Sequence, residues 1–242
     1  MITPPRQNIR WFLVLFSLLL TACSQNPSKN PDPWEGFNRK VFTFNETADK
    51  YLLTPVAKSY RAVTPDPVEE GVSNMFDNLG ELTTIINDLL QFRLLKASAD
   101  TGRFLINSTV GVLGFFDVAS RVGLEEDGQD FGLTLARWGV NNGPYVMLPF
   151  LGPSTIRDGV GRVVDSTSGS DIIYKIEHVP TRNQLLALKI VDLRAGLLQA
   201  EGLISGDKYI FIRDVYLQHR AAKASDEPIV DSFGEEDFEE WE

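Results

Sequence analysis

Apolar side chains recur every three or four positions over most of the chain, and this spacing predicts amphipathic helices. The first pattern begins at Asp32-Pro33-Trp34-Glu35, which has the form of a capping box with proline at the first helical position. Because proline disfavours a helical conformation in the residue before it, Thr54-Pro55 is expected to kink or end this helix. Residues 56–63 then add a short second piece.

Further helices are predicted on both sides of Gly80 and toward the end of the chain. Apolar positions at helical spacing cover residues 68–79 and 82–90, so two helices are expected, with Gly80 between them. A second capping box, Thr181-x-x-Gln184, precedes another helix, and Asp207 can cap a last one. The chain has no internal repeat and no convincing run of alternating strands, which favours an all-α fold.

The segment 104–119, FLINSTVGVLGFFDVA, is apolar on nearly every side. As a single helix it would be about 24 Å long, shorter than the ~30 Å hydrocarbon core of a bilayer. A helix that is apolar all round is either deeply buried or in contact with lipid, and the segment alone leaves both open. Gly111 and Gly114 would let another backbone approach it closely.

Residues 139–161, GVNNGPYVMLPFLGPSTIRDGVG, are rich in glycine and proline. Asn142-Gly143-Pro144 is typical of a tight turn, residues 145–151 are apolar and extended, and Ser154 can cap a short helix. We therefore expect a shaped loop here rather than regular structure.

Composition changes the picture at the N-terminus, which holds the one cysteine of the 242 residues. An apolar run over residues 11–20 follows two arginines, and it is too short to span a membrane but typical of a secretory signal. Leu20-Thr21-Ala22-Cys23 resembles the bacterial lipobox, in which cleavage before the cysteine exposes a residue that carries acyl chains. The alternative is an ordinary secretory leader with a chance cysteine. Ser24, where an aspartate would resemble an inner-membrane retention signal, points to the outer membrane.

These features predict a signal peptide over 1–22, a lipidated linker over 23–31, one helical domain over 32–224 and an acidic tail over 225–242. The net charge of −10 is concentrated in the tail, and without its nine acidic residues the chain has 24 acidic and 23 basic residues. A nearly neutral body argues against nucleic-acid binding, which needs a concentrated basic face. We expect the tail to be disordered, either as a solubilising segment or as a docking site for a basic partner.

Signatures of enzymes and metal sites are nearly absent from the sequence. His178 and His219 lack metal-ligand spacing, and there is no cysteine pair, no nucleophile elbow and no phosphate-binding loop. The acidic run 125–130 lacks the alternating spacing of a calcium loop and is interpreted as a solvated turn. The sequence therefore predicts neither catalysis nor a metal or other cofactor. Fifteen phenylalanines and four tryptophans favour a body that contacts lipid, with an ordinary bundle core as the alternative.

Several motifs taken together resemble the MlaA (VacJ) family of outer-membrane lipoproteins. The opening motif is Asp32-Pro33-Trp34-Glu35-Gly36-Phe37-Asn38-Arg39. Matching stretches follow in order: RFLINSTVG at 103–111, DFGLTL at 130–135, and the loop GPYVMLPFLGPSTIRD at 143–158. The resemblance runs from the lipobox to about residue 222. It departs from the family at Leu133, where glutamine is common.

This resemblance implies an all-α, ring-shaped single domain that is embedded in the periplasmic leaflet of the outer membrane and has a central amphipathic channel. It implies that the protein removes mislocalised phospholipid from the outer leaflet and passes it to a soluble periplasmic carrier of the MlaC type, which maintains lipid asymmetry. It also implies association with trimeric porins. Two other functions stay open: a non-transporting envelope scaffold that tethers porins, and a lipid-hydrolysing enzyme, for which a nucleophile and a base are missing.

Candidate site residues follow from this expectation, with Cys23 as the lipid anchor. The apolar residues expected to contact acyl chains are Phe37, Phe42, Phe44, Phe104, Leu105, Val112, Leu113, Phe115 and Phe116. The asparagines expected either to line the channel or to tie helices together are Asn38, Asn45 and Asn107. The residues expected either to gate the channel or to form a rigid turn are Gly139, Asn142, Gly143, Pro144, Tyr145, Pro149 and Gly152.

Overall fold

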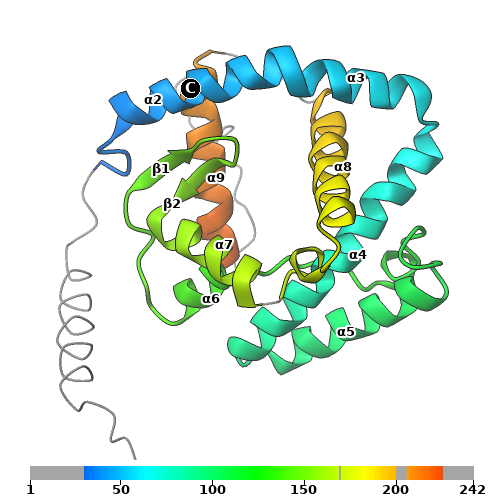
Figure 1. The fold of residues 1–242 in the computed structure, drawn as a ribbon. Helices are drawn as coiled ribbons and strands as arrows, with labels where there is room; N and C mark the ends of the chain where they lie inside the picture. The colour runs from blue at the N-terminus through cyan, green and yellow to red at the C-terminus, as the bar shows by residue number, and fades with distance from the viewer. Residues whose placement is uncertain (1–29, 169, 200–205, 226–242) are drawn as a thin grey trace, which may run out of the picture.

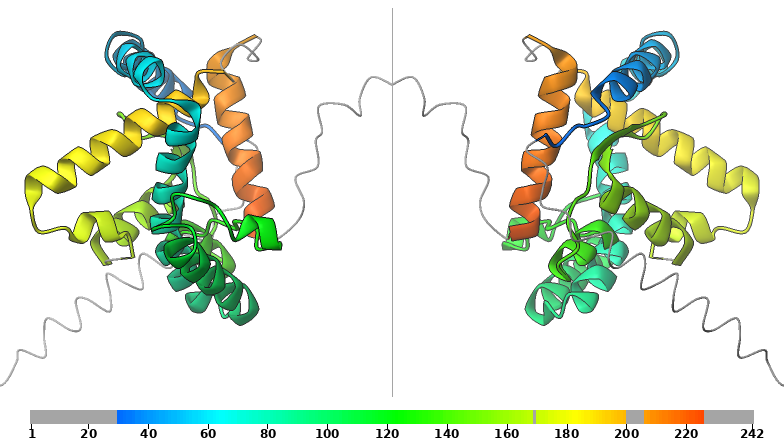
Figure 2. Two further views of the ribbon diagram at one scale, coloured as in Figure 1. Left: turned by 90° about the vertical axis from the view of Figure 1, so that its right-hand side faces the viewer. Right: turned by 90° about the vertical axis from the view of Figure 1, so that its left-hand side faces the viewer.

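The computed structural model describes residues 30–168, 170–199 and 206–225, so the predicted signal peptide, Cys23 and the acidic tail from residue 226 on lie outside the described residues. The helices follow one another around a ring (Figure 1). In chain order the elements are α2 (Glu35–Ala48), η1 (Asp49–Leu53), α3 (Thr54–Val63), α4 (Asp66–Leu90), α5 (Leu94–Thr109), η2 (Ser120–Val122), α6 (Phe131–Arg137), β1 (Tyr145–Leu148), β2 (Gly152–Thr155), α7 (Ile156–Ser168), η3 (Ile172–Lys175), α8 (Val179–Leu197) and α9 (Lys208–Ser225). Seen edge-on, α8 projects to one side of the ring (Figure 2). The predicted helical fold is confirmed, with one small hairpin added.

The first helix begins at Glu35, slightly later than the capping box predicts, and no side chain caps it. Asp32 is buried instead, where its carboxylate accepts hydrogen bonds from Asn38 Nδ2 at 2.8 Å and from the Tyr209 hydroxyl. The capping role predicted for Asp32 is therefore wrong, because this carboxylate joins the start of α2 to α9.

The break expected at Thr54-Pro55 takes the form of a change in helix type. The π-helical turn η1 directly precedes α3, and Pro55 lies in the first turn of α3. A proline is tolerated there because the first backbone N–H groups of a helix have no partner within it. Together α2, η1 and α3 form one long side of the ring (Figure 1).

The break predicted at Gly80 is wrong, because α4 runs unbroken from Asp66 to Leu90. A glycine inside a helix costs only about 1 kcal/mol relative to alanine. Contacts of α4 with α5, α6 and α8 outweigh that cost.

The segment 104–119 is not one helix, which corrects the prediction. α5 ends at Thr109, and Val112 and Leu113 have positive φ angles of 56° and 59°, which a helix does not allow. Asn107 holds the turn that follows, because its Oδ1 accepts hydrogen bonds from the backbone N–H groups of Val118 and Ala119. The close approach expected at glycine is present within this turn: a Cβ at Gly111 would lie 2.3 Å from the Phe116 carbonyl oxygen.

The glycine-rich stretch contains regular structure that the sequence analysis did not predict. β1 and β2 form an antiparallel hairpin in which Tyr145 is opposite Thr155 and Leu148 is opposite Gly152. The helix after it is α7, and its first turn is capped by Thr155, whose Oγ1 accepts a hydrogen bond from the Asp158 N–H. Ser154, the predicted cap, instead donates to the Thr155 carbonyl.

The last two helices are where they were predicted, but one cap differs. The N-cap of α8 is His178, whose Nδ1 accepts from the Thr181 N–H, so Thr181 does not cap the helix. Asp207 does cap α9, because its carboxylate accepts from the N–H groups of Tyr209 and Ile210.

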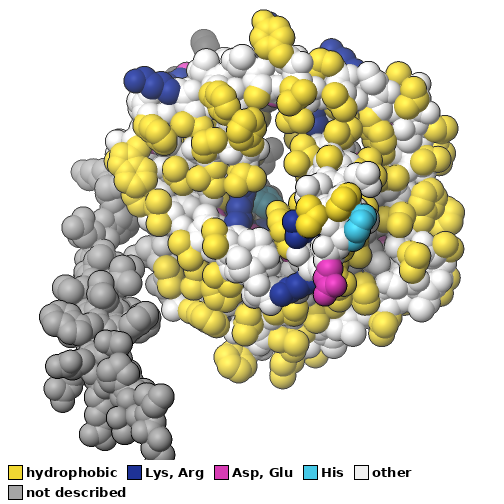
Figure 3. All heavy atoms as spheres, in the orientation of Figure 1, with side chains coloured by type: hydrophobic (Ala, Val, Ile, Leu, Met, Phe, Trp, Pro, Cys, Tyr) yellow, Lys and Arg dark blue, Asp and Glu magenta, His cyan; other side chains and the backbone are white. Residues whose placement is uncertain are grey.

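The packing of the described residues is inverted relative to an ordinary water-soluble domain. Among them, 11 hydrophobic residues are buried, against 20 polar or charged ones, while 36 large hydrophobic side chains are exposed. Hydrophobic side chains dominate the face of the molecule seen in Figure 3. None of the described helices combines the length and the apolar character that crossing a bilayer requires.

Candidate functional site in the ring interior

An opening passes through the ring beside α8 (Figure 3). It adjoins a cavity of about 1020 Å³ whose walls come from α4, the loop before α6, the hairpin, α7, η3 and α8. Apolar side chains such as Phe76, Leu148 and Val163 line much of this cavity. We treat it as the candidate site because segments far apart in the chain, from α4 to α8, meet in its wall.

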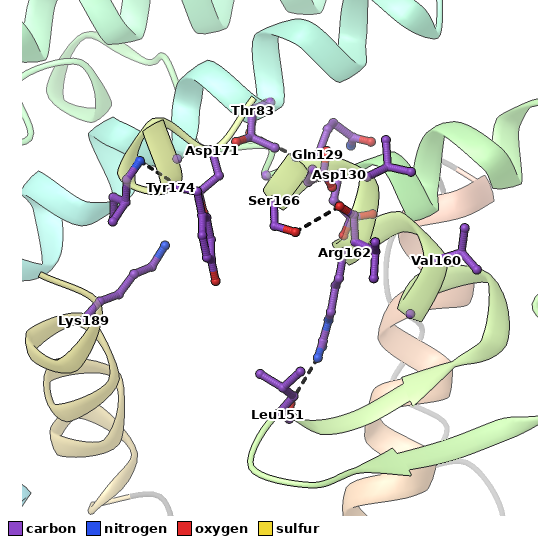
Figure 4. A pocket seen from close by; sticks show the side chains of 18 of the residues that line it. Thr83, Gln129, Asp130, Leu151, Val160, Arg162, Ser166, Asp171, Tyr174 and Lys189 are labelled. Atoms are coloured by element: carbon purple, nitrogen blue, oxygen red, sulfur yellow. Dashed lines mark hydrogen bonds between the residues drawn. The ribbon is translucent and has the colours of Figure 1, made fainter. Parts of the chain in front are cut away.

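Charged side chains from four different elements reach the same cavity. They include Asp77 of α4, Glu126 of the loop before α6, Arg162 of α7 and Lys189 of α8. Lys189 and Tyr174 lie on one side of the open space, and Arg162 and Leu151 lie on the other (Figure 4). The interior is therefore amphipathic, with charges of both signs against apolar walls.

The surroundings of Asp77 shift its pKa. Solvent reaches its side chain through the ring interior. Burial nevertheless raises the pKa of Asp77 to about 6, and the nearby charge of Glu126 adds to the increase, whereas Lys189 opposes it. Asp77 is thus mostly ionised at neutral pH and becomes protonated in mildly acidic solution.

The hairpin beside the cavity is fastened to α2 by two of the predicted asparagines. Asn38 Nδ2 donates to the Tyr145 carbonyl at 3.2 Å, and its Oδ1 accepts from the Met147 N–H at 2.9 Å. Asn45, two helical turns further on, does the same with the Leu148 carbonyl and the Phe150 N–H, each at 2.9 Å. Residues seven apart share one face of a helix, which explains how both amides meet one strand.

The other side of the hairpin is fastened to α7. The Arg162 guanidinium donates to the carbonyls of Leu151 at 3.1 Å and Pro153 at 3.2 Å, as Figure 4 shows for Leu151. The Asn142 and Pro144 carbonyls accept from the first backbone N–H groups of α7. The predicted gating loop is therefore held along both of its edges.

The individual residues of this loop differ in their freedom. Tyr145 is fully buried, whereas Pro149 and its neighbour Phe150 are exposed at the hairpin tip. Gly139, Gly143 and Gly152 have φ angles of 87°, 65° and 78°, which favour glycine over any other residue. A movement that opens the cavity at the tip would need fewer broken hydrogen bonds than one that moves the strands.

A buried charge cluster supports α7 from behind. Arg220 of α9 donates to both carboxylate oxygens of Asp158, at 3.0 and 2.9 Å, and also pairs with Asp130, the N-cap of α6. Burial acts to raise the pKa of Asp158, but the hydrogen bonds and positive charge of Arg220 outweigh it, so this pKa is lowered. The cluster joins α6, α7 and α9.

The acidic run 125–130 is not simply a solvated turn, which corrects the interpretation made from sequence. Asp130 pairs with Arg220, Asp127 pairs with Arg93 at 3.0 Å, and Gln129 is buried against Gln91. Glu126 remains exposed.

Asn107 belongs to a second buried network, at the end of α5. Its Nδ2 donates to Asp117 at 3.0 Å, and Arg103 donates to Glu81 at 2.6 Å and to Asp117 at 3.0 Å. Burial acts to raise the pKa of Asp117, but hydrogen bonds led by those from Ser120 lower it to about 2. All three predicted asparagines thus have their amides engaged by other protein groups.

The candidate lipid-contact residues fall into two groups. Those exposed on the outside of the molecule are Phe37, Phe44, Leu105, Val112, Leu113 and Phe116. Those half-buried are Phe42, Phe104 and Phe115. Phe42 packs edge-on against the Tyr209 ring, and Phe115 lies so close to α4 that a Cβ at Gly71 would be 2.3 Å from its ring.

The charged lining residues were missed by the sequence analysis. The position of Asp77 could have been inferred from helical spacing. It lies three residues before Gly80 and seven before Thr84, so all three share one face of α4, and that face lines the cavity. No comparable signal marks Arg162 or Lys189, since only the closure of the ring brings α7 and α8 to the same space. In the described part of the chain, no group of three or more metal-ligating side chains is placed to hold an ion.

Comparisons with known proteins give a consistent result. A family model described as MlaA lipoprotein matches residues 30–223. The chain is 35% identical to the intermembrane phospholipid transport system lipoprotein MlaA of Escherichia coli (strain K12) over 215 residues, which cover 85% of this chain and 84% of the relative. For the protein of the same name from Haemophilus influenzae, the identity is 33% over 229 residues, with 90% and 91% covered.

Other matches agree. An uncharacterized protein of Rickettsia prowazekii is 38% identical over 196 residues, which cover 80% of this chain and 77% of the relative. A solved structure reported under "Structural basis for maintenance of bacterial outer membrane lipid asymmetry" is 35% identical and superposes with a TM-score of 0.69, covering 80% of this chain and 98% of the other.

Proposed function

Because this chain belongs to the MlaA family of lipoproteins, we propose that it removes mislocalised phospholipid from the outer leaflet of the outer membrane and passes it through its central opening to a soluble periplasmic carrier. The observation that carries this proposal is the pairing of an apolar outer surface with an opening that is lined by charged groups. No covalent chemistry is involved, so the protein acts as a conduit rather than an enzyme.

The apolar outer surface supports a position within lipid. Monomeric soluble proteins rarely expose contiguous apolar patches above a few hundred Å², and larger ones mark contact with membrane or protein. A half-exposed large apolar side chain forfeits roughly 1 kcal/mol in water, so the exposed set sums to the order of tens of kcal/mol. We propose that acyl chains cover it, with Phe37, Phe44, Leu105, Val112, Leu113 and Phe116 among the contacts.

We propose that the ring lies in the periplasmic leaflet, as the family resemblance implies. One leaflet is about half of the ~30 Å hydrocarbon core. A ring in this position would receive lipid only from the far leaflet, because its outer surface separates the interior from its own leaflet.

The charged interior lowers the barrier that keeps phospholipid on one side. An isolated polar group in hydrocarbon costs several kcal/mol unless it is hydrogen-bonded, so headgroups rarely cross unaided. Asp77, Arg162 and Lys189 provide a polar path, while apolar residues of the same cavity accompany the acyl chains.

The anchor and the partners complete the proposal. Acylation of Cys23 would hold the protein at the membrane, at ~0.8 kcal/mol per buried methylene. We further propose that a trimeric porin contacts part of the apolar outer surface and that an MlaC-type carrier receives lipid on the periplasmic side. A non-transporting scaffold that tethers porins is the competing function.

A blocked interior separates transport from scaffolding. Gly80 lines the cavity inside α4, and a Cβ there meets no atom within 4 Å, so Gly80→Phe adds a ring to the cavity without a clash. We expect cells carrying this variant to expose phospholipid at their surface as deletion cells do. The matched control is Gly36→Phe, at an exposed glycine of α2 that also has no neighbour within 4 Å. Normal clearance by a folded Gly80→Phe protein would favour the scaffold.

The anchor is tested in the same assay. Deletion cells are complemented with wild type or with Cys23→Ser, which cannot be acylated. We expect Cys23→Ser to leave surface phospholipid high while the wild type restores the normal level. Full rescue by Cys23→Ser would show that the anchor is dispensable.

Gating by the hairpin is a separate proposal, with the tip at Pro149 and Phe150 as the moving part. The rings of Phe44 and Phe150 are 5.0 Å apart, so cysteines at these two positions can be joined by a short thiol-reactive cross-linker. We expect the linked protein to lose lipid clearance and each single-cysteine variant to keep it. Unchanged clearance by the linked protein would reject gating.

A further inference from the structure

Two charges of opposite sign face the ring interior at the place where two cavities meet. Asp77 of α4 and Lys189 of α8 both line the main cavity, and both line a smaller one of about 270 Å³ between these helices. The two side chains are close enough for Lys189 to act on the titration of Asp77.

Neither side chain is used to hold the fold together. Among the described residues, Asp77 and Lys189 make no hydrogen bond and no ion pair with each other or with any neighbour. This sets Asp77 apart from three other acidic lining residues, because Asp130, Asp165 and Asp171 accept the hydrogen bonds of Leu133, Phe131 and Ile173. Of the other acidic lining residues, only Glu126 likewise lacks such a partner among the described residues. Arg162 differs as well, because it donates to two carbonyls of the hairpin.

Both charges are reached by solvent from the ring interior, but once a lipid displaces that water a charge beside apolar walls is costly without a partner of opposite sign. Buried charges elsewhere in the protein avoid this cost by forming ion pairs, as Arg220 and Asp158 do. Asp77 and Lys189 instead keep their hydrogen-bonding capacity free toward a space that has apolar walls. A ligand that supplies one anionic group, one cationic group and an apolar body would satisfy the whole arrangement.

We propose that Lys189 and Asp77 form a headgroup-selecting site, in which Lys189 binds the phosphate and Asp77 binds the ammonium group of a zwitterionic, amine-bearing phospholipid. This inference rests on the proposed function and adds a preference among lipids. An ammonium group can donate hydrogen bonds to the Asp77 carboxylate, and Glu126 adds negative charge on the same side. An anionic lipid whose headgroup ends in a neutral polyol gains nothing from Asp77 and has its phosphate placed near two carboxylates.

The test measures which lipid the full-length protein retains. Purified wild-type protein is incubated with vesicles of phosphatidylethanolamine and phosphatidylglycerol in equal amounts with identical acyl chains, then re-isolated, and its bound lipid is quantified by mass spectrometry. We expect the bound fraction to be enriched several-fold in phosphatidylethanolamine. Asp77→Asn should bring the ratio toward that of the vesicles, and Lys189→Gln should reduce the retention of both lipids.

Two control variants remove a charge of the same sign at a position away from the cavity. Glu70→Gln lies on the same helix as Asp77, and Lys58→Gln lies on α3. Both residues are exposed, and neither lines either of the two cavities described above. Both controls should keep the wild-type ratio and amount, and circular dichroism verifies the fold of each variant.

The outcomes distinguish this site from the proposed function. Lipid retained at the vesicle ratio by the wild type, or an unchanged ratio in Asp77→Asn, overturns the headgroup site and leaves transport standing. A wild-type protein that retains no lipid overturns both.

Discussion

The outer surface and the interior packing of the ring obey opposite rules, and α2 shows both. Phe37 and Phe44 point outward and are exposed, while Asn38 and Asn45, each the next residue along, point inward and are hydrogen-bonded to the hairpin. In a water-soluble domain the apolar residues would be inside. Here many apolar side chains are exposed, and the interior is held together by polar groups that each hydrogen-bond to a particular partner.

This difference predicts where the chain tolerates change. An apolar contact with lipid is non-directional, so one outward residue can replace another with little effect on the fold. A buried hydrogen bond or ion pair is directional, and a removed partner leaves the remaining group unsatisfied. Substitutions of similar chemical size should therefore differ greatly in cost between the two regions.

The largest effect is expected at the buried charge cluster. Arg220→Met leaves Asp158 and Asp130 without their main cationic partner, which typically costs about 3–5 kcal/mol in the free energy of unfolding. The measurement is the denaturant unfolding midpoint in detergent. Arg121→Met, at an exposed position of η2, is the matched control and should change little. Equal losses in the two variants would mean that the cluster is not a structural centre.

An intermediate effect is expected from pH, through a carboxyl group buried between α4 and α5. Burial raises the pKa of Asp88 to about 7, and its hydrogen bond with Asp100 adds to the increase. The unfolded chain releases this proton near pH 4, so between about pH 4 and pH 7 the folded state binds more protons and its stability falls as pH rises. Unfolding midpoints at pH 5 and pH 8 should differ accordingly.

Replacement of the titrating group isolates its share of this pH dependence. Asp88→Asn cannot release a proton and should flatten the decline between pH 5 and pH 8. A decline as steep as that of the wild type would assign the effect to other groups, of which Glu81, with its pKa raised by burial to about 7, is the first candidate.

The smallest effect on stability is expected on the outer surface. Leu95 of α5 is 88% exposed, and Leu95→Gln should change the free energy of unfolding by no more than about 0.5 kcal/mol. Two residues further on, Ala97 is 4% exposed, and Ala97→Gln should cost about 1–3 kcal/mol through overpacking. If the ring lies in lipid as proposed, flotation with vesicles should reverse the order, because the Leu95 variant would lose apolar contact with lipid. A larger stability loss at Leu95 would contradict the inverted packing.

The sequence predicted the elements whose signals are local. The spacing of apolar positions located α2, α8 and the two halves of α4, and the cap at Asp207 located α9, because each signal is a property of one segment. The prediction of a break at Gly80 was wrong, because contacts of α4 with three other helices stabilise the helix at a residue of low helix propensity. The cap predicted at Asp32 was wrong as well, since Tyr209, the partner that buries this carboxylate, lies 177 residues away in the chain.

The candidate site was less accessible from sequence, for the same reason. Asn38 and Asn45 could be identified as candidate polar residues on an amphipathic helix, but their partners are more than 100 positions away. Asp77 and Lys189 resemble ordinary surface charges within their own helices. Only the closed ring brings them to the same cavity, and no sequence motif predicts that the ring closes.

The way α2 holds the hairpin has a consequence for solubility outside the membrane. A two-stranded sheet normally leaves open strand edges on which another chain can add a strand. Along the free edge of β1, however, the Tyr145 N–H donates to the Pro31 carbonyl, and Asn38 occupies both the Tyr145 carbonyl and the Met147 N–H. The Pro31 main chain and the Asn38 side chain thus take the place of a neighbouring strand. They prevent another chain from pairing along this edge, which is the first step toward fibres.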